Sequence, residues 1–97
     1  MATVIGTEKL PGENVAQAVD FTPVLGTAET VTFGEVTIIE EDGDAAPAGM
    51  VTTVGVSSDR VTFTLAGGVS NTRYILDVLA TLNVGDKIGQ RLLLTVL

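Results

Sequence analysis

The sequence has no cysteine, no histidine and no tryptophan among its 97 residues. Without cysteine the chain has neither disulfides nor thiol nucleophiles nor thiolate metal ligands. Without histidine it lacks the side chain that most often acts as a general base near neutral pH. These absences exclude zinc fingers and most mechanisms of nucleophilic catalysis. We therefore expect a protein that is not an enzyme, with no catalytic residue, no metal and no cofactor.

Basic residues and long apolar runs are scarce as well. Five Lys and Arg stand against twelve Asp and Glu, which gives a formal net charge of -7 at pH 7. Because nucleic-acid binding depends on clustered Lys and Arg, we expect no nucleic-acid partner. The longest apolar segment, residues 74–82, is interrupted by Asp77 and is shorter than the roughly 20 residues of a membrane helix, so no membrane contact is expected. The first residues hold no basic region and no apolar run, which predicts no signal peptide and folding in the cytoplasm.

Valine and threonine dominate the apolar stretches, and such β-branched side chains favour strands over helices. A chain of this length fits one domain with one thin core. Turn residues divide the apolar stretches at short intervals, and no segment has a helical period. The clearest expected strands are residues 18–25, 29–40, 50–56, 60–66, 73–82 and 88–97. The pattern predicts an all-β fold, an immunoglobulin-like antiparallel β-sandwich of about seven strands in two sheets.

The strand expected at residues 29–40 changes phase at a glycine. Val31 and Phe33 follow one phase of the alternation, whereas Val36 and Ile38 follow the other. One extra residue beside a glycine is typical of a β-bulge or of a strand that bends between sheets. We therefore predict an irregularity at Gly34.

The strand expected at residues 73–82 is apolar on both faces. Ile75 and Leu79 point away from the side that holds Tyr74, which indicates a central strand or one that a partner covers. Tyr74 itself has two interpretations. It is either an ordinary core residue or a buried ring whose hydroxyl bonds to loop backbone, as immunoglobulin-like folds often have at this place.

Residues 40–44 hold the only sequence cluster of hard metal ligands, Glu40, Glu41, Asp42 and Asp44. Calcium prefers such oxygen ligands, but the spacing is not that of an EF-hand loop. Sequence-adjacent carboxylates on a loop also have no buried partner that would separate their pKa values for acid–base catalysis. We favour a solvated loop over a cation site.

Residues 1–17 fit neither a helix nor a regular strand, although they are rich in apolar residues. We interpret them as an extended N-terminal arm, with residues 18–97 forming the sandwich. The arm would add backbone hydrogen bonds to the sheet edge of a neighbouring subunit, and the alternative is a flexible terminus. The expected interaction residues are Val4, Ile5, Leu10, Val15 and Val19 at this end of the chain, with Ile75 and Leu79 on the sandwich.

The order of these signals resembles that of a family of small immunoglobulin-like virion proteins of tailed phages, of the fibre-tail adaptor and decoration type. The resemblance covers residues 9–97 and depends on the order of the motifs, because each motif alone is only a strand and a turn. The motifs are Asp20-Phe21, the Gly67-Gly68 pair, Tyr74, Thr81, the turn at Gly85 with Lys87 and Arg91 after it, and the closing residues 92–96.

The resemblance implies a non-enzymatic structural protein of the virion, made in the host cytoplasm. It further implies a homo-oligomer that contacts other virion proteins, as an adaptor that joins the tail or head–tail connector to fibres or neighbouring subunits. Two alternatives stay open. One is a capsid decoration protein, and the other is a carbohydrate- or cell-surface-binding module, which would need exposed aromatic rings.

Overall fold

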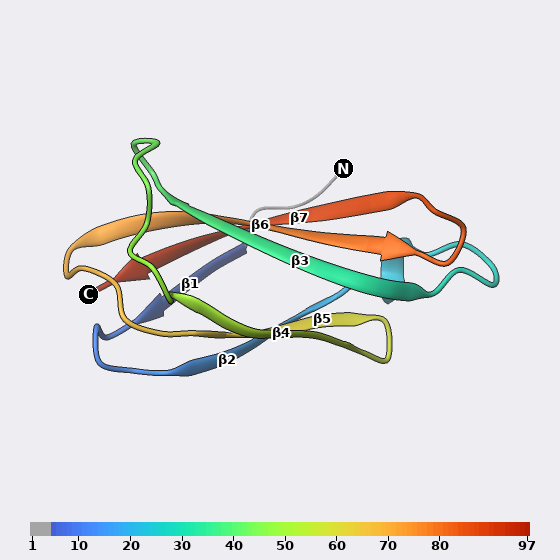
Figure 1. The fold of residues 1–97 in the computed structure, drawn as a ribbon, viewed down its shortest axis with the longest axis horizontal. Coiled ribbons are helices and arrows are strands. Elements are labelled where there is room, and N and C mark those ends of the chain that lie inside the picture. Colours follow the sequence, from blue (N-terminus) through green and yellow to red (C-terminus); the bar gives the residue numbers. More distant parts are fainter. Residues whose placement is uncertain (1–4) are drawn as a thin grey trace.

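The computed structural model describes residues 5–97, and this part of the chain is built from strands (Figure 1). One 3-10 turn, Thr22–Val24, interrupts them. The strands are β1 (Ile5–Lys9), β2 (Val15–Asp20), β3 (Val31–Glu40), β4 (Val51–Ser57), β5 (Arg60–Leu65), β6 (Thr72–Leu82) and β7 (Lys87–Val96). The predicted all-β class is confirmed. No helix within residues 5–97 is long and apolar enough to span a bilayer.

The strands form two sheets that lie over one another as the layers of a sandwich (Figure 1). The four-stranded sheet has the order β1-β7-β6-β3, and the three-stranded sheet has the order β2-β5-β4. All neighbours are antiparallel except β1 and β7, which run parallel. The molecule is elongated, with extents of 42 × 22 × 19 Å. Loops and turns therefore gather at two ends that are far apart.

The core lies between the sheets and follows the period-2 alternation of the strands. β6 sends Tyr74, Leu76, Val78 and Ala80 inward, and all four are fully buried. β5 contributes Val61, Phe63 and Leu65, and β7 contributes Leu92, Leu94 and Val96. The alternation of apolar residues in the sequence therefore coincides with the inner face of these three strands.

The N-terminal segment differs from the extended arm that we expected for residues 1–17. Residues 5–9 form β1, which pairs with β7 from Leu92 to Val96 of the same chain. Residues 15–17 begin β2, which pairs with β5. Both strands thus pair along one side with strands of the same chain, and for the described residues no separate arm exists. The boundary at residues 17 and 18 falls inside β2.

The irregularity in β3 lies close to its predicted position but has another origin. The register with β6 shifts between Val31 and Phe33, so the bulge is centred on Thr32. Gly34 is regular in register, and a Cβ there would lie 2.8 and 2.9 Å from the two methyl groups of Val61. The glycine is needed for the close approach of the two sheets and not for the bulge.

Candidate interaction surfaces

One end of the sandwich is closed by a buried lysine. Lys9 is only 2% exposed, and its ammonium donates to the carbonyl oxygens of Leu10 and Gly67, each at 2.6 Å. A weaker contact joins it to Pro11 at 3.4 Å. A charged group that is buried away from water needs hydrogen-bond partners, and the carbonyl oxygens of Leu10, Pro11 and Gly67 accept those bonds. Lys9 therefore ties the β1–β2 turn to the loop between β5 and β6.

The same loop is held by Tyr74. The phenolic oxygen accepts a hydrogen bond from the backbone N–H of Val69 at 3.0 Å, while the ring is fully buried. This is the second of the two interpretations offered for Tyr74, in which the hydroxyl binds loop backbone. A Cβ on Gly68 would meet Val96 at 2.8 Å, and its φ of +97° also favours glycine. The loop is thus fixed on the core from several directions.

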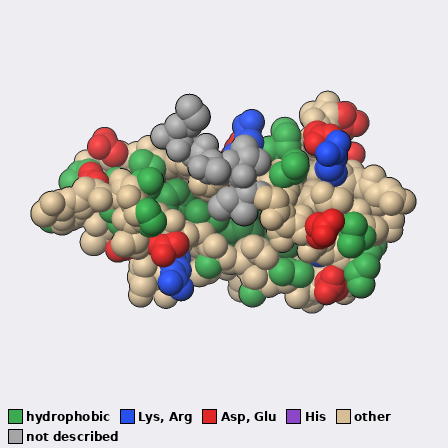
Figure 2. Space-filling view, turned by 180° about the vertical axis from the view of Figure 1, so that it is seen from behind, with side chains coloured by type: hydrophobic (Ala, Val, Ile, Leu, Met, Phe, Trp, Pro, Cys, Tyr) green, Lys and Arg blue, Asp and Glu red, His purple; other side chains and the backbone are tan. Residues whose placement is uncertain are grey.

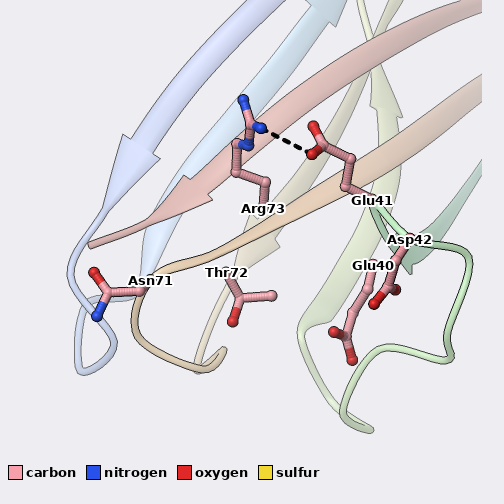
Figure 3. Close-up of a pocket in the computed structure, with 6 residues that line it drawn as sticks. All are labelled: Glu40, Glu41, Asp42, Asn71, Thr72 and Arg73. Atoms are coloured by element: carbon pink, nitrogen blue, oxygen red, sulfur yellow. Dashed lines mark ion pairs between the residues drawn. The ribbon is translucent and has the colours of Figure 1, made fainter.

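The acidic loop lies beside a shallow hollow of about 390 Å³ at this end of the molecule. Figure 3 shows Glu40 and Asp42 across the hollow from Asn71, while Glu41 turns to the guanidinium of Arg73 at 2.9 Å. The other carboxylates do not converge on a point. Among residues 5–97, no group of three acidic side chains is arranged to hold a metal ion.

The outer face of the four-stranded sheet, which we call the outer sheet face, carries the odd-numbered residues of β6, of β7 and of the part of β3 that follows the bulge. It is the upper surface of the upper layer in Figure 1. Across its middle, Ile39 lies opposite Ile75, which lies opposite Leu93, so three apolar side chains form one row. Gly6 of β1 continues the row beyond Leu93. Two predicted interaction residues, Ile75 and Leu79, lie on this face.

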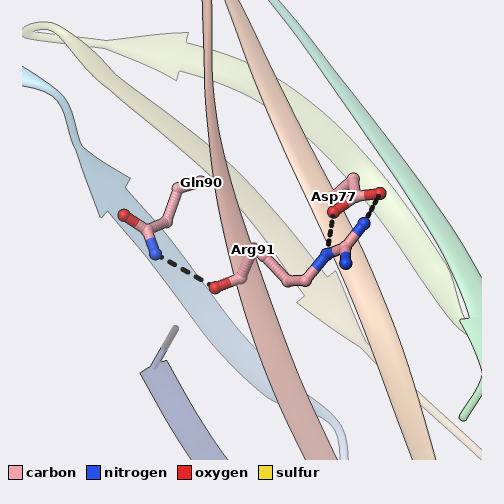
Figure 4. Close-up of polar contacts among 3 residues, drawn as sticks. All are labelled: Asp77, Gln90 and Arg91. Atoms are coloured by element: carbon pink, nitrogen blue, oxygen red, sulfur yellow. Dashed lines mark hydrogen bonds and ion pairs between the residues drawn. The ribbon is translucent and has the colours of Figure 1, made fainter. Parts of the chain in front are cut away.

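Ion pairs interlock the strands on both sides of this row. Arg91 binds Asp77 through two hydrogen bonds, at 2.8 and 3.1 Å (Figure 4). These bonds, followed by the charge of the guanidinium, hold the pKa of the Asp77 carboxyl below its usual value of 3.8, against the opposite effect of burial. Lys87 lies 3.9 Å from Glu35 on β3, two strands away. The partners in these two pairs come from adjacent or next-adjacent strands, so the pairs help fix the register.

The remaining predicted interaction residues are not brought together. Val19 is buried in the core, and Val15 is half-buried on β2, opposite Leu65 of β5. Leu10 is exposed in the turn after β1. Val4 lies outside the described residues, and of Ile5 only the backbone is described, in β1.

Two members of the outer sheet face were missed from the sequence. Ile39 and Leu93 each stand beside another apolar residue, Ile38 and Leu92, so the alternation alone assigns both to a strand without showing that they meet. A residue pattern of period two places side chains on a face but does not say which strands are neighbours. The signal that could have identified them is the pair of adjacent apolar residues in each strand, which makes both faces of the strand apolar.

Figure 2 shows the molecule from behind the view of Figure 1. On this side, acidic side chains are spread along much of the length of the molecule, whereas basic side chains are few. Phe33 is the only exposed aromatic residue of the described chain, because Phe21, Phe63 and Tyr74 are all buried. Such a surface gives little opportunity for aromatic stacking or for phosphate binding. The most distinctive surface of the described chain is the outer sheet face with its ion pairs.

A small two-layer β-sandwich with loops pinned onto its core and an apolar, ion-paired sheet face defines a class of structural proteins that act through their surfaces. The chain belongs to the family described as podophage GP4 fiber-tail adaptor protein gp77, which matches residues 9–95. The resemblance to fibre-tail adaptors is thereby confirmed. Membership gives the chain a structural role in a phage and places it in the virion. No curated protein matches the chain.

Proposed function

We propose that this protein is an adaptor that joins the phage tail to its fibres, acting as several copies within the virion. The observation that carries the proposal is the family match, which extends over residues 9–95 and so includes both sheets. The name of that family specifies a fibre-tail adaptor. Its role consists of contacts and requires no chemistry.

The shape of the molecule supports this role. An adaptor must contact two partners at once, and an elongated body of 42 Å with loops at both ends separates two such contacts. At one end Lys9 and Tyr74 hold the loops rigid. At the other end Asn83 exchanges hydrogen bonds with the segment that precedes β3, donating to Ala28 and accepting from Thr30. Rigid ends favour binding because little conformational entropy is lost on association.

A phage that lacks the gene for this chain provides the test. We expect particles with filled heads and with tails, but without fibres, and restoration of the fibres when the chain is added back. Particles that keep their fibres and lose capsid stability would instead indicate a decoration protein. Particles with fibres that fail to attach to cells would indicate a cell-surface-binding module, for which Phe33 is the one exposed aromatic ring.

A further inference from the structure

The outer sheet face combines exposed apolar side chains with a charge balance that the rest of the molecule lacks. Ile39 is 44% exposed and Leu79 is 37% exposed, while Ile75 and Leu93, which continue the row from Ile39, are half-buried. Leu79 also lies over Gly89, where an added Cβ would be 3.1 Å from its methyl group. The face therefore carries an apolar row and Leu79, with the Asp77–Arg91 ion pair between them.

Three of the five basic residues lie on this face, and each is paired with a carboxylate, as Arg73 with Glu41, Lys87 with Glu35 and Arg91 with Asp77. Counting Glu8 of β1, which lies beside them, the face has four acidic and three basic side chains and a formal charge of -1. The remaining eight acidic and two basic side chains give the rest of the molecule a charge of -6. Identical acidic molecules repel one another, so two copies approach with least repulsion through this face.

The charges on the face are also separated by strand. Lys87 and Arg91 make β7 positive, whereas Glu35 and, just beyond the strand, Glu41 make the β3 side negative. A twofold axis parallel to the strands and above β6 would place β7 of one copy over β3 of the other. The positive strand then faces the negative one twice, and Leu93 lies over Ile39 of the second copy. The outward residues of β6 meet their own copies: Ile75 gives an apolar contact, while Arg73 and Asp77 are each neutralised within their own copy, by Glu41 and Arg91.

Two of the four free sheet edges, those of β3 and β4, are less suited to such pairing. The edge of β3 is occupied at its end by its own loop, because Glu40 donates to the carbonyl of Asp44 at 2.9 Å and Ile39 bridges to Ala45. The edge of β4 is bent by a register shift between Thr52 and Gly55, with Thr53 at a φ of +53°. Both devices hinder the addition of a strand.

We propose that the outer sheet face is the contact between two copies of this chain, packed face to face about a twofold axis above β6. The inference rests on the proposed function, since it names the surface through which the copies of the adaptor associate. Sheets stack in this way with their strands nearly aligned and about 10 Å apart. The contact is self-complementary, as a twofold interface requires.

Sedimentation equilibrium of the purified full chain, over concentrations up to the millimolar range, tests the proposal. We expect a monomer–dimer equilibrium that Ile39→Lys weakens by at least about tenfold, because it places a charge in the apolar row. Val54→Lys is the matched control, since Val54 is 42% exposed on the edge strand of the other sheet. It should change the dissociation constant by less than about twofold. Thermal melting of each variant verifies that the monomer is folded.

A charge swap tests the proposed orientation. Lys87→Glu and Glu35→Lys should each weaken the dimer, because each places like charges across the interface. The double variant restores opposite charges both within one copy and between copies, so its dissociation constant should return to near that of the parent. A double variant as weak as either single variant would contradict the orientation.

The proposal is wrong if the chain stays monomeric at millimolar concentration, or if Val54→Lys weakens association as much as Ile39→Lys does. A chain without residues 2–4 should dimerise as the parent does, and loss of its dimer would assign the contact to the N-terminus instead. None of these results bears on whether fibres are lost from a phage without the gene. The adaptor role and the dimer contact can therefore fail separately.

Discussion

Lys9 illustrates how a single residue closes the open end of a sandwich. Its aliphatic stem lies with the core residues at 2% exposure, and its ammonium replaces water for the carbonyls of Leu10 and Gly67. No carboxylate of the described chain is paired with it. Carbonyl oxygens alone offset the cost of burying the charge, which makes the bonds to them important for stability.

Replacing this ammonium should destabilise the fold. Lys9→Met keeps most of the stem but leaves the carbonyls of Leu10 and Gly67 without their donor, so we expect a loss of about 1 to 3 kcal/mol in the free energy of unfolding. Urea unfolding followed by circular dichroism measures it. Lys87→Met, which removes an exposed lysine 3.9 Å from its partner, should cost less than about 0.5 kcal/mol. Equal losses in the two variants would contradict the role of Lys9.

The Asp77–Arg91 pair should make stability depend on pH in the acid range. The hydrogen bonds from Arg91 lower the pKa of Asp77 in the folded chain below its value of 3.8 in the unfolded one. The pair therefore stabilises the fold fully above the unfolded pKa, and this contribution is lost as the pH falls through the folded pKa. Because the pair is half-exposed, it contributes only about 0.2 to 1 kcal/mol. Asp77→Asn should unfold with a smaller change between pH 5 and pH 2 than the parent, and an identical pH profile would refute this.

Strand pairs show why some glycines and turns occur where they do. The β4–β5 hairpin turns at Ser58 and Asp59, with φ of +50° and +64°, which are the dihedrals of a type I′ turn. Asp59 also accepts the backbone N–H of Val31 at 3.0 Å, so it joins the two sheets. Close approach of the sheets recurs at Gly34, which faces Val61.

Adding a methyl group at Gly34 should therefore be costly. Gly34→Ala would bring a Cβ to 2.8 Å from a methyl group of Val61, and overpacking of this kind costs about 1 to 3 kcal/mol. Gly12→Ala is the control, because no atom lies within 4 Å of its added Cβ. Thermal unfolding compares them. The double variant Gly34→Ala, Val61→Ala should lose less than the sum of the single variants, and strict additivity would show that the two side chains do not clash.

At the scale of the whole molecule, stability depends on closing both sheets within one chain. β1 covers half of β7 and carries Lys9 into the end of the sandwich, and β2 completes the three-stranded sheet. The parallel pairing of β1 and β7 joins residues near the two ends of the described chain. We therefore expect the chain to fold cooperatively from its first strand to its last.

Truncation tests this cooperativity. A chain without residues 2–9 loses β1 and the Lys9 ammonium, so we expect it to lack a cooperative thermal transition and its well-dispersed amide resonances. Such a result would show that residues 5–9 are a strand needed for folding and not an arm that binds a neighbouring subunit. A truncated chain that melts cooperatively within a few degrees of the parent would show that β1 is dispensable for folding.

Calcium should not stabilise the protein. Among residues 5–97 no three acidic side chains are grouped to hold a metal ion, and Glu41 is held by Arg73. Calcium binding to the folded chain would raise its melting temperature by mass action. We expect no change at millimolar calcium in differential scanning calorimetry, with sodium chloride of equal ionic strength as the control. A rise of several degrees would identify a site.

The sequence by itself determined the class of the fold and much of its detail. Alternating apolar residues at Val61, Phe63 and Leu65 place a strand and its inner face, because the side-chain period of a strand is local. The hairpin turn at Ser58 and Asp59 and the two-sided apolar strand β6 follow from equally local signals. The order of these motifs along the chain was sufficient to indicate the family.

The tertiary structure alone decided which strands become neighbours. Nothing local to residues 5–9 shows that they pair in parallel with β7, because that pairing joins segments more than eighty residues apart. The burial of Lys9 follows from this pairing, since its carbonyl partner at Gly67 reaches it only when the sandwich closes. The row of Ile39, Ile75 and Leu93 likewise exists only once three strands are aligned in register. Periodicity assigns a side chain to a face, but the neighbours that share the face depend on non-local pairing.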